Sequence, residues 1–583
     1  MARHLKNRHR QRPAHESSTN GNQSIVSMLQ QLRPPWSQAV SDKMLARLIV
    51  HENLSFRIVE SPYFREYVQY QRNTNHIPNS ADSARDWIVT GYEEAKSKVR
   101  ELLAGALTSI HLSIDAWTTP QLTMAILGIV AHFVGADRKL YGVVIGFEEL
   151  DGPHSGMNMA EYVYKVVEDY GITNSLGYLV MDNATSNDTL VHALEKRLVL
   201  SHWRSEDHRL RCFGHILNLS VRAFWFGERG SKTRQQGIYE MIVVDEEKEE
   251  ADEFATWRKI GPWGKIHNIC CYIRSSTERK ERFRKAGAQK MVTEENATRW
   301  NTGYTMLKTA LELQDHLEIF CNRHPDLKND VLNENEWQQL AAVLEILKPF
   351  FDATKRMERR TITIAEVIPR LDFLTSKYRL VISSYAAEKD IHIVQAANLG
   401  LAKLEKYFTM IRKTPAYIAA VILDPSTKME FFESSSWTVK SIQKAKDLVV
   451  HLWETEYKGQ EGTQISIARD TEIEEEECME WRMKRRRISK GDQLEQYLAV
   501  PIEDGSVEYV EWWCHKKAIW PQLSKMALDI LSIPSMSADA ERLFSSGKMV
   551  LRDSRSRLSS SSMVALECLK SWEREGIVQS PIG

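Results

Sequence analysis

The sequence has few cysteines, almost no net charge and no long apolar run. Its 583 residues include only seven cysteines, irregularly spaced, which argues against a disulfide framework and for a reducing compartment. No apolar stretch of about 18 residues occurs, so we expect no transmembrane helix. The first residues are rich in Arg, Lys and His without an apolar segment, so we expect no secretory signal. The formal net charge of −1 does not by itself predict a DNA-binding protein.

The composition is otherwise that of a large globular protein. The hydrophobic share is 43%, which is typical of folded domains. The length exceeds what one simple core can bury, so several domains are expected. Charge is patchy: residues 245–253 and 472–477 are acidic, and residues 484–487 form a short basic cluster. That cluster fits a nuclear localisation signal or a charged surface turn equally well.

Two apolar runs each end at an aspartate. Residues 110–114 lead into Asp115, residues 176–181 lead into Asp182, and a third acid, Glu541, lies at the start of a distant helical segment. Carboxylates at the ends of neighbouring strands can share hard cations, and Mg²⁺ prefers oxygen ligands. Two such ions about 4 Å apart stabilise the attacking and leaving oxygens of a phosphoryl displacement. The pattern therefore indicates chemistry on a DNA backbone, although each acid alone fits a turn or an exposed helix position.

Six short stretches, taken together and in order, carry a family resemblance. The chain resembles the hAT superfamily of DNA transposases, especially the fungal members, from about residue 45 to residue 572. Each stretch alone is a weak motif, whereas six in family order are strong. They are residues 112–118 (LSIDAWT), 181–184 (MDNA), 211–219 (RCFGHILNL), 298–301 (TRWN), 423–425 (LDP) and 533–545, which begins IPS and ends ERLFS.

The resemblance and the hydrophobic periodicity together predict an α/β fold. Between residues 109 and 198 the pattern indicates three strands, a helix, a strand and a helix, which fits an RNase H-like order. We expect an RNase H-like catalytic core interrupted by a large all-α insertion domain, with a helical N-terminal region. The expected parts are a basic flexible lead (1–40), the N-terminal helices (41–105), the first part of the core (106–222), the insertion (223–490) and a C-terminal dimerisation region that completes the core (491–575).

The resemblance also implies roles for named residues. Asp115, Asp182 and Glu541 would be the catalytic residues and the ligands of Mg²⁺ or Mn²⁺. Arg299 and Trp300 would contact DNA, with the Trp300 ring partly exposed and stacked on an extruded base. The simpler alternative for Trp300 is a tryptophan that anchors a helical core.

Zinc is not expected. Cys212 and His215 share one helix face, but zinc needs three or four ligands and no second pair is nearby. We expect them to support the active site structurally. His4 and His9 have the spacing of a zinc-finger helix, and many hAT members begin with a BED finger. The matching cysteines do not precede His4, so that finger is missing or truncated in this sequence.

These observations predict a nuclear hAT-type transposase that cleaves and transfers DNA strands at transposon ends. Its expected partners are double-stranded DNA, as transposon ends and target, and further copies of itself in a homodimer or larger homo-oligomer, without a membrane. The alternative is a transposase-derived protein that binds DNA and dimerises in the nucleus without catalysis. The three acids and Trp300 favour the first interpretation, and the missing finger favours the second.

Overall fold

The computed structural model describes most of the chain between residues 37 and 578. The described residues are 37–71, 77–118, 125–152, 154–198, 200, 203–227, 253–293, 300–387, 390–435, 437–459, 492–505, 507–550 (548–550 by backbone only) and 559–578. His4, His9, the basic cluster 484–487, Arg299 and nearly all of both acidic runs lie outside them. The chain divides into two compact units, one of residues 1–88 with 578–583 and one of residues 89–577.

The regular elements that the structure describes in the first unit are all helices. Ser37 is the N-cap of the first helix, and its hydroxyl oxygen accepts a hydrogen bond from the backbone N–H of Val40 at 3.2 Å. This helix therefore begins before the expected boundary at residue 40. The unit comprises α2 (Gln38–His51), the short helix η1 (Phe56–Glu60), α3 (Pro62–Gln71) and the first turns of α4 (Ala81–Ala104), which continues into the second unit.

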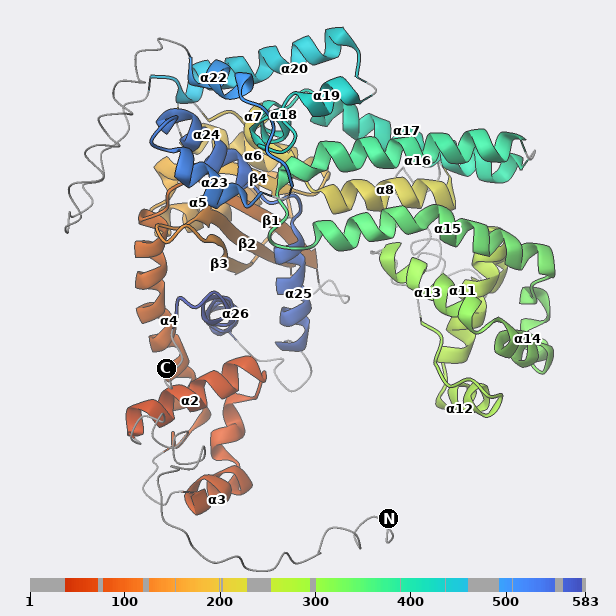
Figure 1. Cartoon of the computed structure of the whole chain (residues 1–583). Helices are drawn as coiled ribbons and strands as arrows, with labels where there is room; N and C mark the ends of the chain where they lie inside the picture. The colour runs from red at the N-terminus through yellow and green to blue at the C-terminus, as the bar shows by residue number, and fades with distance from the viewer. Residues whose placement is uncertain are drawn as a thin grey trace, which may run out of the picture. The chain divides into compact units, whose positions relative to one another are not determined.

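A five-stranded mixed sheet is the centre of the second unit (Figure 1). The strand order is β3-β2-β1-β4-β5, with antiparallel pairing among the first three strands and parallel pairing of β1 with β4 and of β4 with β5. Strand β2 is buried along its whole length, as a central strand of a covered sheet should be. The strands are β1 (Ile110–Thr118), β2 (Ala125–Val134), β3 (Leu140–Glu149), β4 (Leu176–Met181) and β5 (Arg209–Arg211).

The order of these elements agrees with the predicted one, except for β5. Three strands are followed by a helix, a strand and a helix. The edge strand β5 was not predicted, because three residues are too few to produce a recognisable alternation. The helices of this part are α5 (Gly156–Asp169), the one-turn η2 (Thr173–Ser175), α6 (Thr185–Leu198) and the short α7 (Ser205–His208).

The chain from α8 to η6 is helical in the part that the structure describes. Helices α8, α15, α16 and α17 run side by side away from the sheet (Figure 1). One apolar core joins them to the buried sheet residues Tyr178 and Val180, and a second core lies among α11 to α15. The helices are α8 (Phe213–Phe226), α10 (Glu253–Arg258), α11 (Pro262–Arg274), α12 (Thr277–Lys285), α13 (Trp300–Glu312), α14 (Gln314–Asn322), η4 (Pro325–Asp330), α15 (Glu334–Met357), η5 (Ile364–Glu366), α16 (Val367–Ala387), α17 (Ile391–Ile411), α18 (Pro415–Leu423), α19 (Glu430–Ser434), α20 (Val439–Leu452) and the π-helical η6 (Trp453–Tyr457).

The last helices return to the sheet. A carboxylate oxygen of Asp529 accepts a hydrogen bond from the N–H of Ser109 at 2.6 Å, across 420 positions of sequence. At the edge strand β3, the Trp572 indole donates to the carbonyl of Val144 at 2.8 Å. These contacts cover the sheet with segments from the far end of the chain: α22 (Gln493–Ala499), α23 (Tyr509–Lys516), α24 (Pro521–Leu531), α25 (Ala538–Val550) and α26 (Ser560–Arg574).

No described helix combines the length and the apolar composition that crossing a membrane requires. The second unit consists of a sheet with parallel and antiparallel pairs and of a mostly helical remainder.

Candidate active site

Asp115 and Asp182 occupy equivalent positions on neighbouring parallel strands. The register between β1 and β4 pairs Leu112 with Leu179 and Ser113 with Val180. The same step, continued by two residues, sets Asp115 beside Asp182. Asp182 directly follows β4, whereas Asp115 lies within β1, which continues beyond the predicted strand end to Thr118 because residues 116–118 still pair with β2. Neighbouring strands lie about 4.8 Å apart, so the two carboxylates emerge from the same edge and the same face of the sheet.

The Asp182 carboxylate is held by its own loop. Its Oδ1 accepts hydrogen bonds from the N–H of Ala184 at 3.0 Å and from the Asn187 amide at 2.6 Å. The other carboxylate oxygen lies 3.9 Å from Nδ1 of His215. These contacts orient the side chain and leave it partly exposed to solvent. The Asp115 carboxylate accepts from the N–H of Ala116 at 3.0 Å.

Helix α25 brings Glu541 to this face of the sheet. Phe544 packs against Trp117 of β1 with ring centroids 6.2 Å apart. Gly128 of β2 is directly opposite Asp115 in the register, and a Cβ atom there would lie 3.1 Å from Cζ of Phe544. The missing side chain of Gly128 thus permits the close approach of α25. Glu541 is half-buried in the first turn of this helix.

Cys212 and His215 lie between Asp182 and the segment that carries Glu541. The Cys212 N–H donates to the carbonyl of Met181 at 2.7 Å, and its buried thiol contacts Ser537. Burial, together with the nearby charge of Glu541, raises the pKa of this thiol to about 11, so the sulfur stays protonated and uncharged. Burial lowers the pKa of His215, which favours a neutral imidazole beside Asp182.

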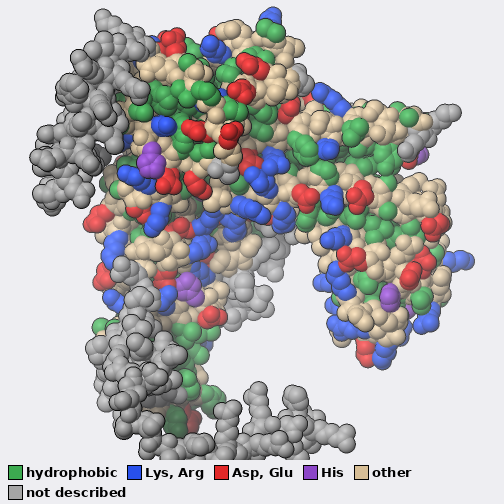
Figure 2. Space-filling view, viewed as in Figure 1, with side chains coloured by type: hydrophobic (Ala, Val, Ile, Leu, Met, Phe, Trp, Pro, Cys, Tyr) green, Lys and Arg blue, Asp and Glu red, His purple; other side chains and the backbone are tan. Residues whose placement is uncertain are grey.

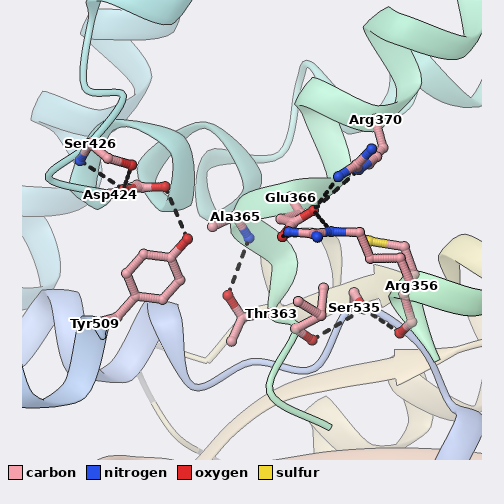
Figure 3. Close-up of polar contacts among 11 residues, drawn as sticks. Arg356, Thr363, Ala365, Glu366, Arg370, Asp424, Ser426, Tyr509 and Ser535 are labelled. Carbon is pink, nitrogen blue, oxygen red and sulfur yellow. Dashed lines mark hydrogen bonds and ion pairs between the residues drawn. The ribbon is translucent and has the colours of Figure 1, made fainter. Parts of the chain in front are cut away.

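The strand-like segment before α25 is fixed by the helical part of the chain (Figure 3). The Ser535 hydroxyl donates to the carbonyls of Met357 and Ile362, each at 3.3 Å. The Ile364 N–H donates to the carbonyl of Ile533 at 3.1 Å. The position of Glu541 therefore depends on residues between α15 and η5, far from either aspartate in sequence.

Figure 3 also shows how this junction is tied to the following helices. Glu366 receives bonds from the guanidinium groups of Arg356 and Arg370. Asp424 accepts a hydrogen bond at 3.0 Å from the hydroxyl of Tyr509, in α23. The 423–425 stretch noted in the sequence therefore connects the helical part to the C-terminal helices.

Asp539 has a structural role and is distinct from Glu541. Its side chain is only 9% exposed and accepts a hydrogen bond from Arg360 at 3.0 Å. Arg542 pairs with the same carboxylate. His132 lies beside it and contacts the Ser113 hydroxyl at 2.8 Å. This buried network fastens the start of α25 to the sheet.

The donor chemistry of the three acids suits a hard divalent cation, because all the donors are oxygens. However, the parts of the chain that the structure describes contain no group of three His, Cys, Asp or Glu side chains at metal-binding spacing. Asp115 and Asp182 are neighbours by register, and Glu541 is on the same face. The three do not form a closed ligand set in this structure.

The Trp300 ring was predicted to be partly exposed, and this prediction is wrong because the ring is buried. Its side chain is 3% exposed and packs in an aromatic cluster with Trp225, Tyr304 and Phe351, at centroid distances of 6.2, 6.2 and 6.3 Å. Its backbone N–H donates to the Asn218 side chain at 3.2 Å. A base cannot stack on a ring enclosed in this way, so Trp300 is a core residue. Arg299 lies outside the described residues.

Lys and Arg side chains gather on this face near α25 and the inner end of α15 (Figure 2). Arg356, Arg360 and Arg542 take part in ion pairs. Arg359 is exposed and has no ionic partner among the residues described. A surface with such cations close to the acidic edge can contact phosphates without reading sequence.

Three family models match successive parts of the chain. The ZBED1 RNase-like domain matches residues 113–208, which contain most of the sheet. The ZBED1 RNase-like helical domain matches residues 210–346. The hAT family C-terminal dimerisation region matches residues 493–573, which include α24 and α25.

The similar proteins are transposases, BED zinc-finger proteins and a regulator. The chain is 25% identical to a protein named as an AC transposase from Zea mays, covering 94% of the chain and 67% of that protein. It is also 25% identical to a protein named as the transcriptional regulator tpeD from Talaromyces stipitatus, covering 88% of the chain. The BED zinc-finger protein DAYSLEEPER of Arabidopsis thaliana is 24% identical, with 92% and 74% covered. The chain belongs to the hAT transposase family.

Membership in the hAT family agrees with the resemblance found in the motifs. The match to tpeD spans 60% of that relative's length, so the relatives contain segments that this sequence does not match. Residues 493–573 match the region that is described as the dimerisation region of the hAT family.

Gly128 and Arg209 were not predicted to be functional residues. No local sequence pattern marks Gly128, because a glycine is needed there only where α25 packs closely against β2. Arg209 lies next to the RCFGHILNL stretch, in a strand too short to recognise. The only pattern in the sequence that could have indicated this strand is the alternation of Arg209, Leu210 and Arg211.

Proposed function

We propose that this hAT protein is a DNA transposase that cleaves DNA at transposon ends and transfers the cleaved strands. The observation that carries the proposal is the shared register of Asp115 and Asp182 at one sheet edge, with α25 packed on the same face. Asp115, Asp182 and Glu541 would hold Mg²⁺ or Mn²⁺. When bound, such ions activate the attacking oxygen and stabilise the leaving oxygen of a phosphodiester.

The chain's own residues prepare this edge for an anionic substrate. Asp182 is oriented by Ala184 and Asn187, so less motion must be restrained when DNA arrives. Burial lowers the pKa of His215, which favours an uncharged imidazole beside the Asp182 carboxylate. The uncharged thiol of Cys212 adds no negative charge beside Glu541.

We infer that the helical part between α8 and η6 is an insertion into an RNase H-like core that α24 and α25 complete. Support comes from the bond between Ser109 and Asp529 and from the packing of Phe544 on Trp117. The bonds of Ser535 to the carbonyls of Met357 and Ile362 give the insertion a role, because they position the segment leading to Glu541.

A transposase with this function would bind double-stranded DNA, as transposon ends and target, and further copies of the same chain. Because the proposed substrate is genomic DNA, we expect the protein in the nucleus. Relatives named as a transcriptional regulator and as BED zinc-finger proteins are consistent with that location.

The test is Mg²⁺- or Mn²⁺-dependent cleavage of DNA duplexes taken from the genomic sequence on either side of the coding region. Asp182→Asn keeps the oxygen that accepts from Ala184 but removes the charge, so cleavage should be abolished and DNA binding kept. The control is Asp447→Asn, the same change on the exposed side of α20, which should cleave normally. Cleavage that persists in Asp182→Asn would reject the assigned role. Binding without any cleavage by the unmodified protein would favour a non-catalytic family member.

A further inference from the structure

A cavity of about 1070 Å³ opens beside the β5 edge of the sheet, bounded by α5, α6, β5 and the end of α17. Arg209 and Arg211 line it, and they alternate with Leu210 along β5. Leu210 and Cys212 belong to the core on the α8 side. Successive strand residues point to opposite faces, so the two arginines project to the other face, where α5 and α6 lie.

The floor of the cavity carries more positive than negative charge. Arg209 has a side chain that is 6% exposed, and its Nε lies 3.0 Å from a carboxylate oxygen of Asp188. The same oxygen of Asp188 lies 3.7 Å from the Arg211 guanidinium. One half-exposed carboxylate thus serves two arginines. The Nη1 atom of Arg209 is buried and makes no hydrogen bond. A buried cation without a full complement of partners is costly, and an arriving anion would relieve that cost.

Arg209 remains a cation despite this burial. Burial, followed by the proximity of Arg211, lowers its pKa to about 10. The group is therefore charged at neutral pH.

Two further cations stand at the rim of the cavity. Lys196 of α6 and Lys413, just beyond α17, are both exposed and line the cavity. Neither has an acidic partner among the residues that the structure describes. Glu161, by contrast, is already paired with Arg197. The free lysines can therefore turn toward an anion without breaking an existing ion pair.

The cavity and the candidate active site share one loop. Arg209 donates hydrogen bonds to the carbonyls of Asp182 and Ala184 at 3.0 and 3.4 Å. Arg211 donates to the side-chain oxygen of Asn183 at 3.0 Å. A ligand in the cavity would thus lie just around the sheet edge from the Asp182 carboxylate.

We propose that this cavity binds backbone phosphates of a DNA strand that runs past the Asp115–Asp182 edge, an inference that rests on the proposed function. Arginine and lysine are the usual donors to phosphate oxygens, and such contacts position DNA without reading its sequence. Met157 and Met410 line the same cavity and offer apolar surface to the deoxyribose. A free nucleotide presents the same phosphate chemistry, and the experiment below separates the two sources.

The experiment measures binding of a fluorescein-labelled duplex from the coding region's genomic flank, by anisotropy, in EDTA and over a range of salt concentrations. The double variant Lys196→Gln, Lys413→Gln should weaken binding and reduce the slope of log K against log salt by about 1.8, since each phosphate contact contributes about 0.9. The matched control is Lys440→Gln, Lys444→Gln on α20, where both lysines are exposed and neither lines the cavity. The control should keep the slope of the unmodified protein.

Asp188→Asn provides a change of opposite sign. Removing this carboxylate leaves Arg209 and Arg211 without their shared counter-ion, so DNA should bind more tightly than to the unmodified protein. The thermal unfolding midpoint of the variant checks that the fold is retained. A structural defect alone would weaken binding, so a gain in affinity identifies an electrostatic site.

Three results would overturn the inference. The first is the same salt slope for the Lys196/Lys413 double variant and its α20 control. The second is no binding of the duplex by the unmodified protein. The third is stabilisation by ATP or pyrophosphate that this double variant loses while its DNA binding is unchanged. The binding assay contains no divalent metal, so the inference can stand when cleavage fails and can fail when cleavage is present.

Discussion

Trp300 lies in a closed aromatic cluster, and its burial determines what a substitution there would do. Trp300→Ala removes a large side chain from the packing against Trp225 and Phe351, and should cost about 3–5 kcal/mol of stability. Trp300→Phe should cost less, because the indole N–H has no hydrogen-bond partner to lose. Urea titration of the three proteins measures the difference. An alanine variant as stable as the unmodified protein would contradict the core assignment.

A half-buried carboxylate in η6 should make stability depend on pH. Burial, followed by the charges of Asp207 and Asp529, raises the pKa of Glu456 to about 7 from an ordinary 4.5. The folded state thus favours the protonated acid, so its contribution is complete below pH 4.5 and is lost as pH rises through 7. The loss is at most about 3 kcal/mol.

Glu456→Gln should abolish this part of the pH dependence. The glutamine variant cannot ionise, so it should gain stability relative to the unmodified protein as pH rises from 5 to 8. Thermal unfolding midpoints across this range measure the effect. Glu454→Gln, on the exposed side of the same turn, is the control and should parallel the unmodified protein. Parallel curves for all three proteins would contradict the assigned cause.

At the scale of elements, the contact of α25 with the sheet depends on Gly128. A side chain at this position would meet Phe544 at 3.1 Å and Leu543 at 3.2 Å. Gly128→Val should therefore displace α25 and with it Glu541. We expect faster hydrogen exchange in α25 and a loss of metal-dependent cleavage, with DNA binding largely kept.

Gly91→Ala is the matched control for this glycine. Gly91 lies within α4, and no atom outside its own stretch of helix lies within 4 Å of the place that an added Cβ would take, so alanine should be accepted there. Because glycine is a poor helix former, this variant should be more stable by about 1 kcal/mol. Unchanged exchange in α25 of Gly128→Val would show that the helix does not rely on this contact.

At the scale of the whole molecule, self-association is the property to test. The hAT dimerisation region covers residues 493–573 and includes Ile519, whose side chain is 52% exposed. Ile519→Asp should weaken the homo-oligomer about tenfold or more if this residue is buried on association. Val439→Asp, also at an exposed apolar position but in α20, should leave association unchanged. Sedimentation velocity over a range of protein concentrations distinguishes the two variants, and equal behaviour would place the interface elsewhere.

The sequence by itself determined the two strands that carry the apolar runs before Asp115 and Asp182, because apolar runs closed by a polar residue are local patterns. It did not determine that β1 continues to Thr118, which depends on pairing with β2. It also determined the family, since the six motifs depend only on residue type and order. Only the tertiary structure decided which of these residues meet. The β1–β4 register sets the two aspartates side by side, and the bonds of Ser535 position α25 from far along the chain. The burial of Trp300 and the sharing of Asp188 by two arginines likewise depend on packing between distant segments, which no local pattern encodes.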